Sequence, residues 1–95
     1  MNSDIFNHLK DSLTKTTNPE NQMYLITRTI GNVGTISRTQ IADLMKYLPS
    51  DYYKLQLSKM AYGYVNDFHS YDHIVGDSFS FHHTKDYLNE YVHRY

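Results

Sequence analysis

Apolar residues recur at spacings of three and four along the first half of the chain, with polar residues between them. This periodicity is that of one face of an amphipathic α-helix, and it occurs in three separate segments. The three apolar stripes are Ile5, Phe6, Leu9 and Leu13, then Met23, Ile26, Ile30 and Val33, then Ile41, Leu44, Met45 and Leu48. Each stripe predicts one helix whose apolar face packs against a common core.

Residues with capping preferences mark where these helices begin. Ser3 or Asp4 is expected to cap the first helix. Asn18 and Pro19 are expected to begin the second, because an Asn side chain accepts hydrogen bonds from first-turn amides and proline needs no amide partner there. The run Ser37-Arg38-Thr39-Gln40 has the pattern of a capping box and predicts the start of the third helix.

Glycine and proline mark the ends of the second and third helices. Gly31 and Gly34 are expected to end the second helix, since glycine adopts a positive φ at little steric cost. Pro49 is expected to close the third helix, and Ser50 to cap the fourth.

The segment from Asp51 to Asn66 predicts a fourth helix that is apolar on two sides. One face carries Tyr53, Leu57, Met60, Ala61 and Tyr64. Leu55 and Tyr62 lie on the opposite side. A helix that is apolar on two faces is usually buried between other elements, so we expect it at the centre of the fold. Gly63 is unfavourable inside a helix and indicates close packing or an early end there.

The periodic segments become shorter after residue 67. A brief helix is predicted with Ser70 as its cap, Tyr71, Ile74 and Val75 as its apolar residues, and Gly76 as its end. The run Phe79-Ser80-Phe81 alternates like a strand, but no second strand is predicted to pair with it, so we expect an extended connector that buries both rings. Thr84 is expected to cap the last helix. Its inner stripe consists of Leu88, Tyr91, Val92 and Tyr95.

Together these elements predict an all-α fold, a compact bundle of five or six short helices with the fourth helix at its centre. A chain of 95 residues is too short for two independent cores, so residues 1–95 are expected to form a single domain. Hydrophobic residues make up 40% of the chain, which is enough for a packed core and is not the composition of a disordered protein.

Composition excludes several classes of function. The chain has no Cys, which rules out a disulfide scaffold, a thiolate zinc site and a thiol nucleophile. Nine Lys and Arg against ten Asp and Glu give a net charge of -1, which argues against binding the phosphate backbone of nucleic acid. No apolar run reaches the roughly 20 residues of a membrane span. The first residues lack the order of a signal peptide, so a cytoplasmic location is expected.

The second half of the chain resembles a known family. The family pattern has a helix ending in Ala-Tyr, then an Asp, a Tyr-containing turn, a Val, a Phe-x-Phe and a closing helix. The corresponding residues are Ala61-Tyr62, Asp67, Tyr71, Val75, Phe79-Ser80-Phe81 and the helix with Leu88 and Tyr91, and upstream the run 35–41 resembles the loop and cap before the family's third helix. The family is a small helical domain of unknown function, found in many bacterial proteins and in the animal proline- and serine-rich proteins.

The resemblance covers roughly Phe6 to Tyr91 and implies an all-α module that acts as an interaction domain. It carries no catalytic or ligand residues to transfer. Ser70 stands where the family often has Asn, and His82 and His83 stand where it tends to have small polar residues. The resemblance therefore does not explain the histidines.

Five of the six histidines lie in the last third of the chain, where they suggest a metal site. His69, His73, His82 and His83 are near two aspartates in sequence, and imidazole with carboxylate can bind zinc. However, a cap at Ser70 would leave His69 outside the helix of His73, and adjacent histidines point apart in an extended segment. We therefore predict no metal and no cofactor, and keep a small metal- or pH-responsive protein as the alternative function.

Catalytic motifs are lacking, which argues against an enzyme. No Ser lies in a Gly-x-Ser-x-Gly elbow. A small bundle that uses most of its apolar residues for the core has little room for a substrate pocket, so a small-molecule substrate is not expected.

Tyrosine is the most unusual feature, with ten residues in the chain and nine of them after residue 46. Tyr53, Tyr64, Tyr71 and Tyr91 lie on predicted inner stripes. Tyr24, Tyr47 and Tyr52 lie off those stripes, with Arg28 and Lys46 close in sequence. Tyr and Arg anchor many interfaces. The sequence therefore predicts a non-enzymatic protein-interaction module that binds an unknown protein partner, with an acidic or amphipathic helical peptide expected first, through Tyr24, Arg28, Lys46, Tyr47 and Tyr52.

Overall fold

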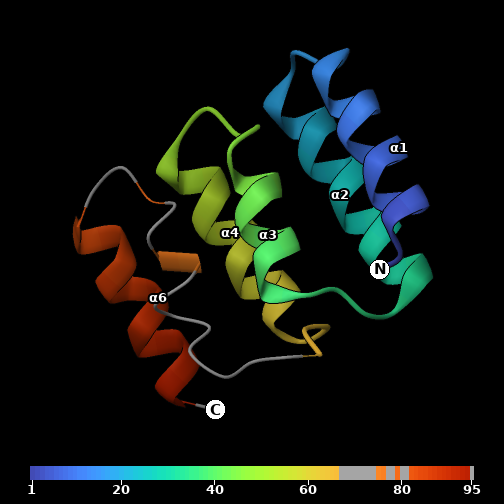
Figure 1. Ribbon diagram of the computed structural model, residues 1–95. Helices are drawn as coiled ribbons and strands as arrows, with labels where there is room; N and C mark the ends of the chain where they lie inside the picture. Colours follow the sequence, from blue (N-terminus) through green and yellow to red (C-terminus); the bar gives the residue numbers. More distant parts are fainter. Residues whose placement is uncertain (67–74, 77–78, 80–81, 95) are drawn as a thin grey trace.

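Five helices make up most of the described chain in the computed structural model, which covers residues 1–66, 75–76, 79 and 82–94 (Figure 1). Side chains are described for these residues except 82, 83, 93 and 94. The helices are α1 (Ser3–Thr14), α2 (Pro19–Val33), α3 (Arg38–Met45), α4 (Asp51–Tyr62) and α6 (His82–Arg94). No strand occurs within the described residues, and the all-α prediction is confirmed.

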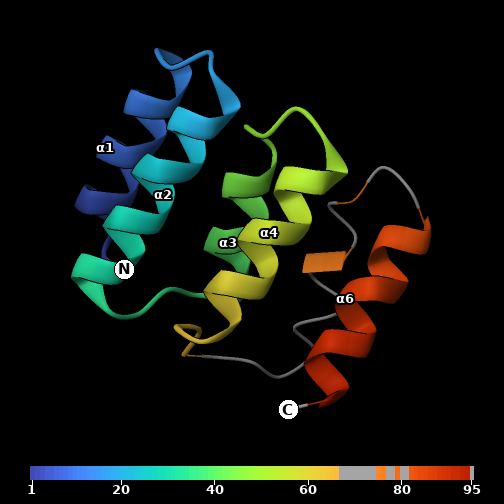
Figure 2. The ribbon, with the colours of Figure 1, turned by 180° about the vertical axis from the view of Figure 1, so that it is seen from behind.

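Helices α1 and α2 form an antiparallel hairpin at one end of the molecule (Figures 1 and 2). Asn18 begins α2 as predicted, because its side-chain oxygen accepts hydrogen bonds from the amides of Glu20 (2.8 Å) and Asn21 (3.3 Å). The cap predicted for α1 is wrong. Asn2 is the cap, and its side-chain oxygen accepts from the Ile5 amide at 2.9 Å. Helix α1 therefore begins earlier than the choice between Ser3 and Asp4 allowed.

Helix α2 ends at Gly34, where φ is +89° and the amide donates to the carbonyl oxygen of Ile30 at 2.8 Å. Only glycine adopts this left-handed conformation without steric cost. The prediction that Gly31 also ends the helix is wrong, since Gly31 lies inside α2.

The chain then turns towards α3 and pairs briefly with the segment that follows α4. The Ile36 amide donates to the Tyr64 carbonyl oxygen at 3.1 Å, and the Asn66 amide donates to the Ile36 carbonyl oxygen at 3.1 Å. The predicted capping box at the start of α3 is confirmed, because the side chains of Ser37 and Gln40 each accept from the other's backbone amide. These bonds fix the end of α2 and the start of α3 beside the end of α4.

Helix α4 lies at the centre, as predicted, and contacts α2, α3 and α6. Leu57, Ser58 and Ala61 are buried along it. The expectation that it extends to Asn66 is wrong, because the helix ends at Tyr62. Gly63 is at the C-cap and has no tight neighbour, so it marks the early end rather than close packing.

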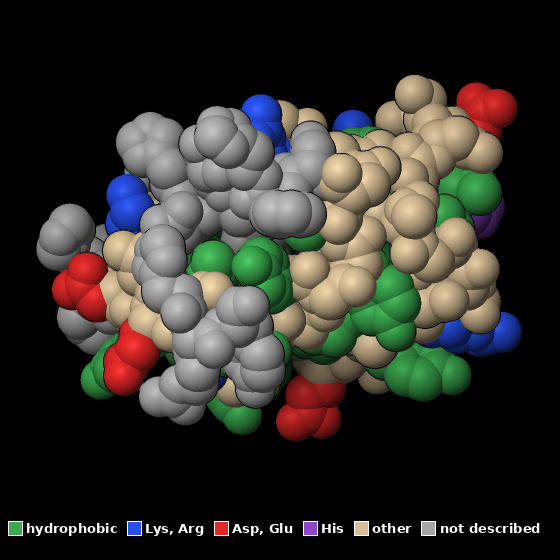
Figure 3. All heavy atoms as spheres, turned by 90° about the horizontal axis from the view of Figure 1, so that it is seen from below, with side chains coloured by type: hydrophobic (Ala, Val, Ile, Leu, Met, Phe, Trp, Pro, Cys, Tyr) green, Lys and Arg blue, Asp and Glu red, His purple; other side chains and the backbone are tan. Residues whose placement is uncertain are grey.

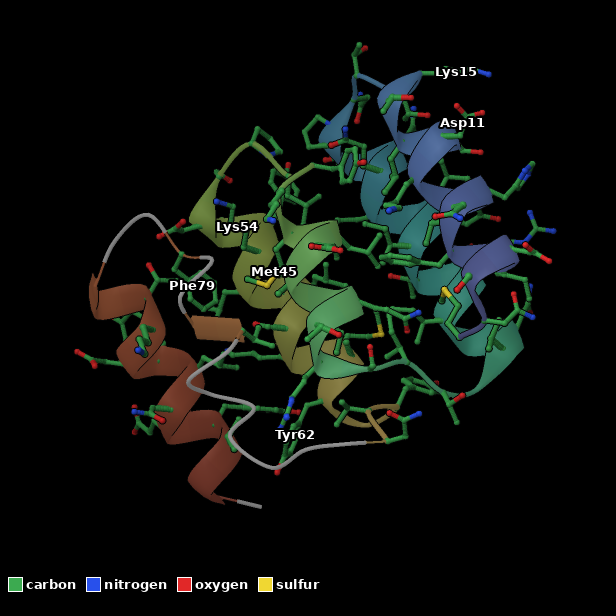
Figure 4. All side chains as sticks on the ribbon, in the orientation of Figure 1. Asp11, Lys15, Met45, Lys54, Tyr62 and Phe79 are labelled. Atoms are coloured by element: carbon green, nitrogen blue, oxygen red, sulfur yellow. The ribbon has the colours of Figure 1, made fainter. Side chains whose placement is uncertain are left out.

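Tyr64, which follows the end of α4, does not lie where the helical pattern predicted. Tyr64 was expected on the inner face but is 38% exposed, because the helical phase that would bury it stops before it. Tyr62, on the second apolar face of the predicted helix, is partly buried against the core as that face implied, and the centroid of its ring lies 6.3 Å from that of Tyr91 on α6. In Figure 4 the Tyr62 side chain lies at the lower end of α4.

The core runs through all five helices. Its buried apolar residues are Phe6, Leu9, Leu13, Ile26, Ile30, Ile36, Ile41, Leu44, Met45, Leu48, Leu57, Ala61, Val75 and Leu88. Most of these positions belong to the predicted stripes. Ile5, like Tyr64, was expected inside but is 38% exposed.

The described part of the C-terminal region covers the far side of α4. Val75 is buried, and Phe79 is partly buried against the core (Figure 4). Helix α6 begins at His82, so the prediction that Thr84 caps it is wrong, and Thr84 is instead a buried residue within its first turn. The predictions for Ser70, Tyr71, Ile74, Phe81 and Tyr95 fall outside the described residues.

Candidate partner-binding surface

The five residues predicted to form a partner surface differ in exposure. Tyr24 is 63% exposed on α2 and Tyr52 is 60% exposed in the first turn of α4. Arg28 and Lys46 are also exposed. Tyr47 is partly buried against the core, so it does not lie free on the surface as its helical phase suggested. The exposed tyrosines have the accessibility that a binding surface requires.

These residues fall into two groups rather than one continuous hollow. Tyr24 and Arg28 are one turn apart on α2, and we call them the α2 face. Lys46, Tyr47 and Tyr52 lie around the connection between α3 and α4, and we call them the α3–α4 cluster. Tyr47 and Lys46 line a hollow of about 260 Å³ with Lys10 and Asp43. Arg28 lines a different hollow.

Contacts within the α3–α4 cluster occupy several of its polar and aromatic groups. The Lys46 ammonium lies 3.4 Å from an Asp43 carboxylate oxygen. The Tyr52 ring lies against the ring of Tyr53, with centroids 5.2 Å apart and planes inclined at 39°. Lys10, across the hollow, lies over the Phe6 ring at 4.6 Å. Lys46 and Tyr52 therefore have contacts within the molecule, although both side chains remain exposed.

Arg28, of the α2 face, lines a groove of about 430 Å³ between α1 and α2. Helix α1 contributes Ile5, His8, Leu9 and Ser12, and helix α2 contributes Leu25, Arg28, Thr29, Asn32 and Val33. Viewed from below, hydrophobic side chains and a histidine lie next to each other at the end of the molecule formed by these helices (Figure 3). The volume of the groove is within the roughly 300–1,000 Å³ typical of ligand sites.

The groove is apolar because the two helices carry more apolar residues than their mutual packing covers. Leu9 is buried at its base, whereas Ile5, Leu25 and Val33 remain partly accessible. Ile5 and Val33 were predicted to lie in the core, and Leu25 was given no predicted role. The spacing of four residues that relates Leu25, Thr29 and Val33 marks a second stripe on α2, beside the core stripe of Ile26 and Ile30, and could have identified this wall.

The lining of the groove includes one permanently charged side chain. Among the described residues that line it, Arg28 carries a charge and none is Asp or Glu. Among the residues that the structure describes, the Arg28 guanidinium has no hydrogen bond or ion pair. At the C-terminal end of α1, the Lys15 ammonium pairs with an exposed Asp11 carboxylate oxygen at 3.3 Å (Figure 4). The groove therefore combines an apolar base with an uncompensated cation at its edge.

The histidines on which the metal- or pH-responsive alternative depends lie largely outside the described residues. His69 and His73 are not described, and only the backbone of His82 and His83 is described, at the start of α6. Among the described residues, no group of three or more His, Asp or Glu is placed to bind a metal. The metal- or pH-responsive function stays a prediction.

A third hollow, of about 140 Å³, lies between α4 and α6. It is lined by Lys59, Tyr87, Glu90 and Tyr91. The Lys59 ammonium lies 5.6 Å from the centre of the Tyr91 ring. This contact joins the two helices across the hollow, which has a third of the volume of the α1–α2 groove.

Residues 1–92 match the family model described as a domain of unknown function, DUF4476. The chain belongs to the DUF4476 family. The match covers almost the whole described fold, so the resemblance seen in the sequence is confirmed at the level of the family. No curated protein and no solved structure is significantly similar to this DUF4476 chain. In its described part, no helix combines the length and the apolar character needed to span a membrane.

Proposed function

We propose that this DUF4476 domain is a non-enzymatic module that binds another protein. The observation that supports the proposal is the α1–α2 groove together with the exposed Tyr24 and the unpaired Arg28 on the adjacent helix face. Large aromatic and guanidinium side chains are the most common interface anchors, because they bury much area with few rotatable bonds.

The division of the predicted surface into two groups makes the proposal testable in two parts. The α2 face has an open, apolar neighbour in the groove. The α3–α4 cluster has its Lys46 ion pair and its Tyr52–Tyr53 contact already in place. We therefore expect the α2 face to contribute most of the binding.

The experiment is capture of a partner from a lysate of the source cell, with mass spectrometry to identify it. The wild-type domain is compared with Tyr24→Ser/Arg28→Ser, with Lys46→Ser/Tyr52→Ser, and with Tyr87→Ser as a control on α6, where Tyr87 is 56% exposed. Circular dichroism checks that each variant is folded.

We expect the α2-face double variant to lose the specifically captured protein and the Tyr87 variant to retain it. Loss only in the Lys46/Tyr52 variant would move the binding surface to the α3–α4 cluster. Equal capture by all four proteins, or no specific capture by any, would contradict an interaction role for these residues.

A further inference from the structure

The α1–α2 groove is long enough to bind a short helix. Its α1 wall runs from Ile5 to Ser12 and its α2 wall from Leu25 to Val33. At 1.5 Å per residue these walls are about 10 and 12 Å long, which is roughly two helical turns. An amphipathic helix presents anchors at i, i+4 and i+7 over the same length.

The residues of each wall are arranged to receive such anchors. Leu25, Thr29 and Val33 form a row along α2, each four residues from the next, and Ile5 and Leu9 form a matching row on α1. The Thr29 hydroxyl donates to the Leu25 carbonyl oxygen at 2.7 Å, so this polar group is satisfied within its own helix. The groove is therefore lined by apolar side chains from both rows together with the polar side chains of His8, Ser12 and Asn32.

The edge of the groove selects the charge of the occupant. Arg28 is exposed and, within the described residues, unpaired, and no carboxylate lines the groove. An Arg guanidinium binds a carboxylate through two parallel hydrogen bonds, which gives orientation as well as attraction. Tyr24 lies one turn before Arg28 on the same exposed side of α2, beyond the residues that line the groove.

We propose that the α1–α2 groove binds an acidic amphipathic helix of a partner protein, with its apolar anchors between Ile5 and Leu25 and a Glu or Asp on Arg28. The inference rests on the proposed interaction function and specifies its site and its partner class. Arg28 sets the charge preference, and the apolar rows supply most of the buried area.

The test is a display library of helical peptides of about 16 residues, long enough to form a helix in the bound state. Three apolar anchors are fixed at i, i+4 and i+7, and the flanking positions vary among Glu, Gln and Lys. A second library carries Ser at the three anchor positions. Both libraries are selected against the wild-type domain, against Arg28→Glu, and against Lys15→Glu, a matched charge change at an exposed cation that does not line the groove.

Selection on the wild-type domain and on Lys15→Glu is expected to enrich Glu next to the anchors, and selection on Arg28→Glu is expected to enrich Lys. The Ser library is expected to give no binder. The best acidic peptide is then made with a Trp at its central anchor, because the chain has no Trp and the fluorescence reports the peptide alone. Its affinity for Arg28→Glu should fall about three- to tenfold, as for a charge pair at an interface edge.

NMR shifts caused by the same peptide locate the site. Shifts confined to the residues of the groove support the proposal. Shifts elsewhere, such as around Tyr52 or Tyr87, overturn the groove assignment and leave the interaction function standing. Enrichment of the same charge on all three proteins, or no enrichment, overturns the acidic-helix inference. If the lysate experiment also yields no partner, the proposed function fails as well.

A second copy of the chain is the remaining occupant to exclude. Size-exclusion chromatography over a range of concentrations detects self-association. A dimer whose interface maps to the groove, and which the acidic peptide does not dissociate, would overturn the proposal. A monomer with peptide-induced shifts in the groove supports it.

Discussion

Leu57 is a buried residue of the central helix. It is completely buried on α4, the helix that contacts α2, α3 and α6. Nearby Ser58 is also buried, and its hydroxyl donates to the Leu55 carbonyl oxygen at 2.9 Å. A buried hydroxyl satisfied within its own helix costs little, whereas a cavity at Leu57 has no such compensation.

Replacing Leu57 by Ala is expected to lower the free energy of unfolding by about 2–5 kcal/mol, the usual cost of a buried Leu→Ala change. Small domains have about 5–15 kcal/mol in total, so this change brings the domain close to unfolding. Urea denaturation measures the loss. The control is Gln56→Ala on the exposed side of the same helix, expected within about 0.5 kcal/mol of wild type. A loss below about 1 kcal/mol for Leu57→Ala would contradict its central place.

At the scale of the element, two glycines three residues apart have opposite roles. Gly31 lies inside α2 with nothing within 4 Å of a Cβ built on it. Gly34 ends the helix with φ +89°. Helical interior positions favour alanine over glycine, whereas a positive φ favours glycine.

We therefore expect Gly31→Ala to stabilise the domain by about 0.5–1 kcal/mol and Gly34→Ala to destabilise it by roughly 1–2 kcal/mol. Thermal unfolding of the two variants, recorded beside wild type, should show shifts of opposite sign. A stabilising Gly34→Ala would show that α2 does not end in the left-handed turn, and a destabilising Gly31→Ala would show that this turn of the helix is not regular.

The helices could be predicted from the sequence because each has local signals for its start, its stripe or its end. Asn18, Ser37 and Gln40 make the predicted capping bonds. The start of α6 could not be predicted in this way, since its first residues, before Thr84, carry no preferred capping residue. Helical phase correctly predicted that Tyr24 is exposed, because this exposure depends only on the opposite side of α2 being buried.

The groove could not be predicted by phase alone. Ile5 and Leu9 lie on the same apolar stripe, yet Leu9 is buried and Ile5 is 38% exposed. The difference depends on how far α2 covers α1, and this is set by the packing of the hairpin rather than by the sequence of either helix. A stripe wider than one neighbouring helix can cover is the pattern that such a groove leaves in a sequence.

At the scale of the whole molecule, α4 is the described helix that contacts both the α1–α2 hairpin and α6. The α1–α2 hairpin packs on one side of it through α2, and α6 packs on the other (Figures 1 and 2). The backbone pairing of Ile36 with the segment after α4 adds a second link on the hairpin side. Small domains built around one shared element usually unfold in a single cooperative step.

Leu88→Ala tests this cooperativity, because Leu88 is completely buried on α6, far along the chain from the hairpin. We expect the free energy of unfolding to fall by about 2–5 kcal/mol. Because α4 contacts both parts, the NMR signals of Ile26 on α2 and of Leu57 on α4 should show the same lower urea midpoint. The dependence of the free energy on urea should stay unchanged, since the same surface is exposed on unfolding. A midpoint that falls only for signals of α6 and Leu57, with Ile26 unaffected, would contradict a single folding unit. The α1–α2 hairpin and its groove would then fold independently of the C-terminal helix.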